Sequence, residues 1–560
     1  MRRSLITTLI LLSLVSGCSD LTISRYFEVG ALATVAPIAT DIGVKVFSDG
    51  GNAYDVTVAV GFALAVVHPQ AGNLGGGGFA LIRDGDSKKI SALDFRETAP
   101  QLATQDMYLD DSSEVIDNLS TEGALAAGVP GSVAGLFAIW QAGALLPWSN
   151  LVTRSAELAD SGFIIDEYLA ASIAEYADDL KIFQETAALF APGGNLLQAG
   201  DRLILPDLAR TLHKIAAEGT DGFYGGEVAA AIEQTMLSHG GLIRTTDLSQ
   251  YQPIWREPVH FQFDSLDIYS MSPPSSGGLI VGQILKLLEP YDFTSISSDS
   301  PEYMHLFCEA SRLAFADRSK HLGDPDFYNV PDALLDTNYL NQRRLLISAE
   351  HAGNSETTEP GHPLQLESDQ TTHFSVCDGQ GNMISITTTL NTGFGSKLVV
   401  GGAGFLLNNE MDDFAIKPGY PNTYGLIGAE ANKIEPGKRM LSSMSPTIVM
   451  RNGQPLLILG SPGGSKIITT VANAIINYTR FNLPLEKVAS QPRFHHQWLP
   501  DKIYLEEGSY GVATMQRLIR YGHDVTERER YSDLQMISVE QAGLMLPVSD
   551  PRNGGKASGY

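Results

Sequence analysis

The stretch that decides the fold is Gln370–Asn391, which reads QTTHFSVC-DGQGN-MISITTTLN. Both flanks are rich in β-branched residues, and the middle contains two glycines, an Asp and an Asn. This pattern predicts a β-hairpin with a five-residue loop. Pairing that is symmetric about Gln380 would place Thr371 opposite Thr389, on the same face, with Cβ atoms about 5 Å apart.

The residues before the hairpin suggest a second role for Thr371. Residues 350–370 are polar, contain prolines and have few aliphatic side chains, so they read as a mobile connector. A connector that runs into Thr-Thr-His suggests a self-cleaving precursor, in which the Thr371 hydroxyl attacks the carbonyl of Gln370. An N-to-O acyl shift and hydrolysis would then free an N-terminal Thr. Its amino group, with a reference pKa of about 7.7–8.0, would serve as base for its own hydroxyl. The hairpin alone is more typical of an ordinary Thr–Thr strand pair than of a self-cleaving site.

Four motifs follow in order and add to the hairpin. They are TLNTGFG at 389–395, LLNNEMDDF at 406–414, SSMSPTIV at 442–449 and GSPGGS at 460–465. Together with the hairpin, this series resembles the γ-glutamyltransferase family of N-terminal-nucleophile hydrolases over nearly the whole mature chain. The resemblance implies an α+β fold, a four-layer αββα sandwich formed jointly by two self-processed subunits. It also implies γ-glutamyl transfer and hydrolysis on glutathione and related compounds.

The resemblance gives roles to residues of the catalytic step. Thr371 would be nucleophile and base, and Thr389 would orient it. Gly463 and Gly464 would form the oxyanion hole, which suits a glycine turn before a helix N-terminus because backbone N–H groups there favour negative charge. Without the family, that segment reads as a plain strand-to-helix turn.

Further residues would bind the substrate. By resemblance, the α-carboxylate is held by Arg96, Ser442 and Ser443, the α-amino group by Asn391, Glu410 and Asp413, and Tyr424 belongs to a lid. An arginine suits a carboxylate because it can bind both oxygens. The acidic run 408–413 would be costly to bury without a cationic partner. Read alone, the pair Arg96–Glu97 is more typical of a surface ion pair.

The first residues predict export. Two arginines and an apolar run from Leu5 to Val15 form a signal segment, 1–17, that is too short to span a membrane as a mature helix. Small residues before Cys18 resemble a bacterial lipoprotein box, and a plain secretory signal with an incidental Cys is the alternative. The expected products are a large subunit, 18–370, and a small one, 371–560, in the periplasm and anchored by a lipid on Cys18.

Composition excludes some partners. With 38 basic and 64 acidic residues the net charge is −26, which argues against nucleic acid. Cys308 and Cys377 are expected to be buried free thiols. No cofactor or metal is expected, since Asp324-Pro325-Asp326 reads as a turn and the adjacent His495 and His496 would face opposite ways on a strand.

The sequence also predicts a few individual helices and strands, and it leaves two alternative functions open. An all-round apolar helix through Val67 and strands at Phe79–Arg83 and Phe405–Leu407 are predicted. A glutaryl or cephalosporin acylase of the same superfamily remains an alternative, although such an enzyme needs no α-amino site and Glu410 and Asp413 argue against it. An inactive lipoprotein that only binds peptides is the other.

Overall fold

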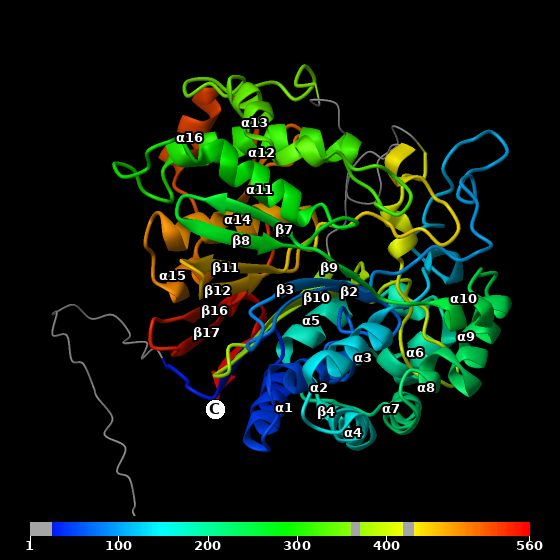
Figure 1. Ribbon diagram of the computed structural model, residues 1–560. Helices are drawn as coiled ribbons and strands as arrows, with labels where there is room; N and C mark the ends of the chain where they lie inside the picture. The colour runs from blue at the N-terminus through cyan, green and yellow to red at the C-terminus, as the bar shows by residue number, and fades with distance from the viewer. Residues whose placement is uncertain (1–24, 360–369, 418–429) are drawn as a thin grey trace, which may run out of the picture.

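Two β-sheets stack between two layers of helices, as Figure 1 shows for the computed structural model, which describes residues 25–359, 370–417 and 430–560. This confirms the expected αββα sandwich. The first sheet has seven strands in the order β18-β1-β9-β10-β2-β3-β6. Their bounds are β1 Gly30–Thr34, β2 Gly77–Arg83, β3 Ile90–Asp94, β6 Ile254–Arg256, β9 Gln370–Asp378, β10 Met383–Asn391 and β18 Lys556–Gly559.

The second sheet has six strands in the order β17-β16-β12-β11-β8-β7. Neighbouring strands in both sheets run antiparallel, and each sheet contains strands from before and after Thr371. The strands are β7 Val259–Phe263, β8 Leu266–Ser270, β11 Thr447–Arg451, β12 Gln454–Gly460, β16 Gln535–Val539 and β17 Met545–Ser549. Two smaller sheets join β13 Phe494–His495, β14 Ile503–Glu506 and β15 Val525–Arg528, and β4 Phe163–Ile164 with β5 Arg202–Leu203.

The helices divide between the two outer layers (Figure 1). The layer beside the seven-stranded sheet contains α1 Pro37–Ser48, α2 Ala53–Val67, α3 Ser132–Gly143, α4 Trp148–Ser161, α5 Glu167–Glu175, α6 Gln184–Phe190, α7 Pro206–Glu218, α8 Asp221–Tyr224, α9 Gly226–Ser238 and α10 Thr245–Gln250. The layer beside the six-stranded sheet contains α11 Gly277–Leu288, α12 Pro301–His321, α13 Thr337–Arg344, α14 Ser465–Thr479, α15 Leu485–Ser490 and α16 Val512–Tyr521. Every residue of α2 is buried, as its apolar sequence predicts.

The seven-stranded sheet is buried on both faces. Along β2, Ala80 and Ile82 pack in the core under the helices α1–α10, whereas Phe79 and Leu81 pack in the core shared with the second sheet. Successive side chains of a strand point to opposite faces, so the same strand contributes to two cores. The hairpin β9–β10 lies in the middle of this sheet, with both of its strands paired on either side.

Some expectations differ from the structure or lie outside its described part. Phe405–Leu407 is not a strand: Leu406 and Leu407 make only isolated bridges, to Val399 and Gly75. Its partners come from two different segments, so no continuous ladder forms.

Residues 1–24, 360–369 and 418–429, which include Cys18 and Tyr424, are outside the described residues. Within the described ranges, no helix has the length and apolarity needed to cross a bilayer. Both described cysteines, Cys308 and Cys377, are buried free thiols, as predicted.

A close contact between the two sheets makes Gly460 a position where a larger residue should destabilise the protein. Any Cβ on Gly460 of β12 would overlap the ring of His373 in β9. That ring is fixed by hydrogen bonds with Thr387 (2.9 Å) and Ser375 (3.1 Å), and burial lowers its pKa to about 3. Gly460→Ala should therefore lower the free energy of unfolding by about 1–3 kcal/mol in urea titrations. Gly401→Ala is the control, because the nearest atom to its Cβ would lie 4.0 Å away. Equal stability of the two variants would contradict the prediction.

Candidate active site

The hairpin has the predicted register. Thr371, the second residue of β9, lies directly opposite Thr389 of β10. The Thr371 Oγ1 atom is buried and makes no hydrogen bond to any described residue. The Thr389 Oγ1 atom accepts a hydrogen bond from the backbone N–H of Asn391 at 2.7 Å. A hydroxyl without a structural partner is thus positioned beside a second hydroxyl that is held in place.

A buried asparagine fixes this end of β10. Asn73 donates to the Thr389 carbonyl at 2.8 Å and accepts from Gly76 N–H at 2.9 Å and from the Ser132 hydroxyl at 2.6 Å. A Cβ on Gly76 would collide with the Thr389 carbonyl oxygen. The glycine run 75–78 therefore serves close backbone approach, as the sequence indicates, and it carries the β2 strand against β10.

Thr371 lines a cavity of about 380 Å³ together with Gly463, Lys466 and Ser532. Gly463 has φ +123° and Gly464 has φ +56°, conformations that glycine adopts without strain. A Cβ at Gly463 would overlap the Ser532 hydroxyl. Helix α14 begins at Ser465, and the first N–H groups of a helix have no partner within it. The cavity therefore combines a nucleophile-type hydroxyl with a helix N-terminus suited to an oxyanion.

The second part of the site is a buried charge cluster around Arg96. Its Nη1 lies 2.6 Å from Glu410 Oε2 and 3.7 Å from Glu97 Oε2, and its Nη2 lies 2.5 Å from Asp413 Oδ2. The same guanidinium donates to the carbonyls of Met440 and Leu441, both at 3.3 Å. Arg96 is only 1% exposed. Arg96 and Glu97 therefore do not form the surface pair that their adjacency alone indicates.

Three carboxyl groups surround the one arginine in this cluster. Burial raises the pKa of Asp413 well above its usual range, although Arg96 opposes the shift. Burial likewise raises the pKa of Glu97 to about 8, with Arg96 again opposing. Glu410 and Asp413 belong to one 3₁₀ turn, Glu410–Asp413. A cluster of three carboxyl groups around one guanidinium favours a second cation over a second anion.

Asn391, Ser442 and Ser443 connect to this cluster. The bulge after Thr389 gives Asn391 a φ of +77°, and its side-chain N–H donates to the carbonyl of Asn409 at 2.9 Å. Asn391 thereby links the hairpin to the turn that carries Glu410. Ser442 and Ser443 directly follow Leu441, whose carbonyl binds Arg96.

The structure does not place all predicted site residues around one cavity. Among the described residues, the lining of the Thr371 cavity includes Gly463 but none of those predicted to bind the substrate α-groups. Those residues form the buried cluster, and Asn391 joins the two parts through the hairpin. Tyr424 is outside the described residues.

Several residues near the site escaped the sequence analysis. Asn73 holds Thr389, and Asn408 accepts from the N–H groups of Gly128 and Glu410 at 2.8 and 3.0 Å. Arg318 of α12 donates to the hydroxyls of Ser276 and Ser443 at 2.7 and 3.2 Å. The position of Asn73 just before a glycine run was the available signal, whereas nothing local marks Arg318, because its partners are distant in sequence.

Comparison with known proteins identifies the family. The model of the family described as Gamma-glutamyltranspeptidase matches residues 39–560. A glutathione hydrolase proenzyme of Escherichia coli (strain K12) is 44% identical over 526 residues, covering 94% of this chain and 90% of that protein. A cephalosporin acylase from Bacillus halodurans superposes with a TM-score of 0.85 at 25% identity, covering 99% of both chains. The γ-glutamyltranspeptidase of Helicobacter pylori is 42% identical, with a TM-score of 0.57, over 58% of this chain and 94% of that one. The chain belongs to the γ-glutamyltranspeptidase family.

Proposed function

We propose that this chain is the precursor of an enzyme that hydrolyses and transfers the γ-glutamyl group of glutathione and related compounds. The observation that carries the proposal is the position of Thr371: its hydroxyl is opposite Thr389 and shares a cavity with Gly463. The order of motifs and the family membership support the same activity.

The first step is cleavage of the precursor. The Thr371 hydroxyl adds to the carbonyl of Gln370, the C–N bond breaks, and the acyl group moves to oxygen as an ester. Water then hydrolyses that ester and leaves a free amine on Thr371 and a carboxylate on Gln370. The products are the fragments 18–370 and 371–560. Strands of both fragments share both sheets, so the fragments stay associated.

Turnover uses the same hydroxyl. The Thr371 amine takes the hydroxyl proton as Oγ attacks the γ-amide carbonyl, and Gly463 and Gly464 stabilise the oxyanion by their N–H groups. The proton passes to the leaving amine, and a γ-glutamyl ester remains on Thr371. Water completes hydrolysis, or the amine of an amino acid or peptide completes transfer. Thr389 keeps the nucleophile oriented.

Recognition uses both charges of the glutamyl α-carbon. Arg96, Ser442 and Ser443 bind the carboxylate, while Glu410 and Asp413, with Asn391, bind the ammonium. In the structure Arg96 is paired with Glu410 and Asp413. A bound zwitterion would replace these ion pairs with two others, one between Arg96 and its carboxylate and one between the acids and its ammonium. Exchange of this kind keeps every buried charge paired. Tyr424 would cover the acyl group as part of a lid.

The chain's location also belongs to the proposal. Removal of the segment 1–17 and acylation of Cys18 would anchor the enzyme in the periplasm. The alternative activity is that of an acylase, which the likeness to the Bacillus halodurans cephalosporin acylase favours. Such an enzyme has no use for Glu410 and Asp413 as an ammonium site. An inactive peptide-binding lipoprotein would remain a single uncleaved chain.

The first prediction concerns cleavage. Thr371→Ala should leave one band near the full-length mass of 60.3 kDa, because no other residue supplies the attacking hydroxyl. Thr372→Ala is the matched control: its side chain is buried on the other face of β9, opposite Thr388, and cleavage should continue. Electrophoresis and N-terminal sequencing of the small fragment measure both. A fragment that begins anywhere other than Thr371 contradicts the mechanism.

The second prediction separates the two activities. Glu410→Gln should lower kcat/KM for a γ-glutamyl anilide by about 10- to 100-fold, because the ammonium loses a buried charged partner. The same change should not lower the rate with a glutaryl anilide, which has no ammonium.

Asp412→Asn provides the control for the second prediction. It removes one charge from the same turn, at a carboxylate that accepts from the Ser120 hydroxyl at 2.6 Å. Its effect on the γ-glutamyl substrate should be small. Faster turnover of the glutaryl anilide by the unmodified enzyme would favour the acylase.

A further inference from the structure

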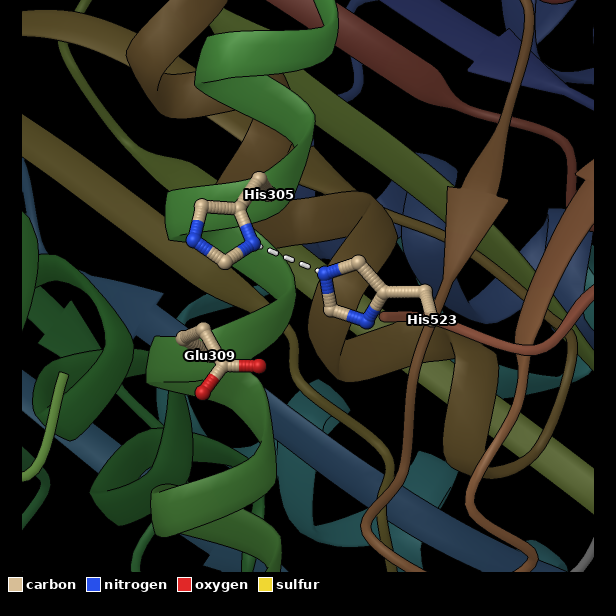
Figure 2. A group of neighbouring side chains, drawn as sticks. All are labelled: His305, Glu309 and His523. Carbon is tan, nitrogen blue, oxygen red and sulfur yellow. Dashed lines mark hydrogen bonds between the residues drawn. The ribbon is translucent and has the colours of Figure 1, made fainter. Parts of the chain in front are cut away.

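A buried group of side chains far from Thr371 has the composition of a metal site. His305 and Glu309 lie one turn apart on α12, and His523 lies just after α16 (Figure 2). One ligand atom from each of these residues lies within 4.8 Å of the others, and all three residues are buried. Spacing of four residues places His305 and Glu309 on the same face of the helix.

The hydrogen bonds define where the protons are. His305 Nε2 lies 2.8 Å from the carbonyl oxygen of Ser348, which can only accept, so Nε2 carries the proton. The lone pair of Nδ1 therefore points at His523 Nε2, 2.8 Å away, and His523 donates to it (Figure 2). Metal-binding histidines commonly donate one ring N–H to a backbone carbonyl and bind the metal through the other, unprotonated nitrogen. His305 has this arrangement, with Nε2 as the donor and Nδ1 as the unprotonated nitrogen.

Hydrogen bonds also fix the orientation of the Glu309 carboxylate. Its Oε2 accepts from Gly353 N–H at 3.0 Å, and its Oε1 accepts from Arg312 Nη2 at 3.1 Å. Arg312 Nε also donates to Oε1, at 3.3 Å, so Oε2 is the oxygen that retains a lone pair. Tyr521 stacks on His305 with ring centroids 4.4 Å apart, which holds the imidazole in this orientation.

The charges in this region do not balance. Arg312 is the cation for two carboxylates, Glu309 and Asp501. His305 accepts a hydrogen bond at Nδ1 and donates one at Nε2, so its imidazole is neutral in this arrangement. Neutral imidazole is the form that binds metal. The two carboxylates exceed the one guanidinium by one negative charge, which a divalent cation would compensate.

We infer that His305, Glu309 and His523 bind a divalent transition metal of the Zn²⁺ class. Two imidazoles and a carboxylate are a ligand set that zinc accepts, with water as the fourth ligand. Zn–N bonds of about 2.0–2.1 Å in a tetrahedron require the two nitrogens to separate to roughly 3.3 Å. Binding moves the His523 proton from Nε2 to Nδ1, so no proton is released.

The site would join the two proposed fragments. His305 and Glu309 precede Thr371, and His523 follows it. The outer contacts, Ser348 and Gly353, flank the start of the segment 350–370, which the sequence indicates is mobile. In the structure the beginning of that segment is fixed by hydrogen bonds: besides the contact of Gly353, the Ser355 N–H donates to Asp501 at 2.7 Å. The role as a tie between fragments depends on the proposed cleavage, whereas metal binding itself does not.

The test measures metal binding directly. Full-length protein freed of metal with EDTA is titrated with Zn²⁺ by calorimetry and with Co²⁺ by visible absorption, which reports the coordination geometry. We expect one Zn²⁺ per chain, a tetrahedral Co²⁺ spectrum and a rise in Tm of about 2 °C at a hundredfold excess over Kd.

Variants separate this site from surface binding. Glu309→Gln and His523→Gln preserve hydrogen-bonding groups at both positions and should weaken Zn²⁺ binding at least tenfold, with Tm of the metal-free variants showing that they fold. His260→Ala is the matched control, since His260 also lies against a carboxylate, Asp267 at 3.1 Å, but on the surface. Its binding should not change. The uncleaved Thr371→Ala variant should bind equally well, which keeps this result independent of the catalytic proposal.

Three outcomes would overturn the inference. They are less than one bound Zn²⁺ per chain, an octahedral Co²⁺ spectrum, and affinities of Glu309→Gln and His523→Gln equal to that of the unmodified chain. In each case the three side chains are a buried polar group that does not bind a metal as proposed.

Discussion

The register of the hairpin β9–β10 is the constraint on which the site depends. Side chains alternate along a strand, so a shift of one residue would move the Thr371 hydroxyl to the opposite face of the sheet. The register is fixed at both ends. At the tip, Asp378 accepts from the N–H groups of Gln380, Asn382 and Ala53 at 2.9, 3.0 and 2.9 Å, which ties the turn to the start of α2. At the other end, Asn73 binds the carbonyl of Thr389. The proposed nucleophile, Thr371, is thus placed by contacts that lie outside its own residue.

The Arg96 cluster shows how a protein keeps several charged side chains in its interior. Isolated burial of any one of them would be costly, and the ion pairs of Arg96 with Glu410 and Asp413 offset much of that cost. Under the proposed function, the same pairing would make the cluster selective for its ligand. A ligand that supplies only an anion would leave the acids of the turn without a cation, whereas an amino-acid head group supplies both charges.

The sequence predicted what is local and missed what depends on distant contacts. The hairpin, its Thr–Thr pair and the glycine turn before α14 follow from residue types within short windows. The burial of Glu97 and the failure of Phe405–Leu407 to form a strand depend on partners far along the chain. Helix α12 illustrates the limit. Its charged residues Glu309, Arg312 and Arg318 are all buried, although the helical pattern alone gives them no reason to be. The roles of the individual site residues remain predictions of the family resemblance.

The strand order has a consequence for how the chain is made. The N-terminal strands β1 and β2 are not neighbours, because the hairpin β9–β10 lies between them, and β18 at the very end of the chain pairs with the outer side of β1. This sheet is therefore incomplete until β18 has been made, and the helical layer α1–α10 is made before the hairpin β9–β10 in the middle of the sheet that it covers. Until β9, β10 and β18 have been made, the edges of β1 and β2 that these strands cover stay unpaired. Unpaired strand edges are natural binding sites for chaperones.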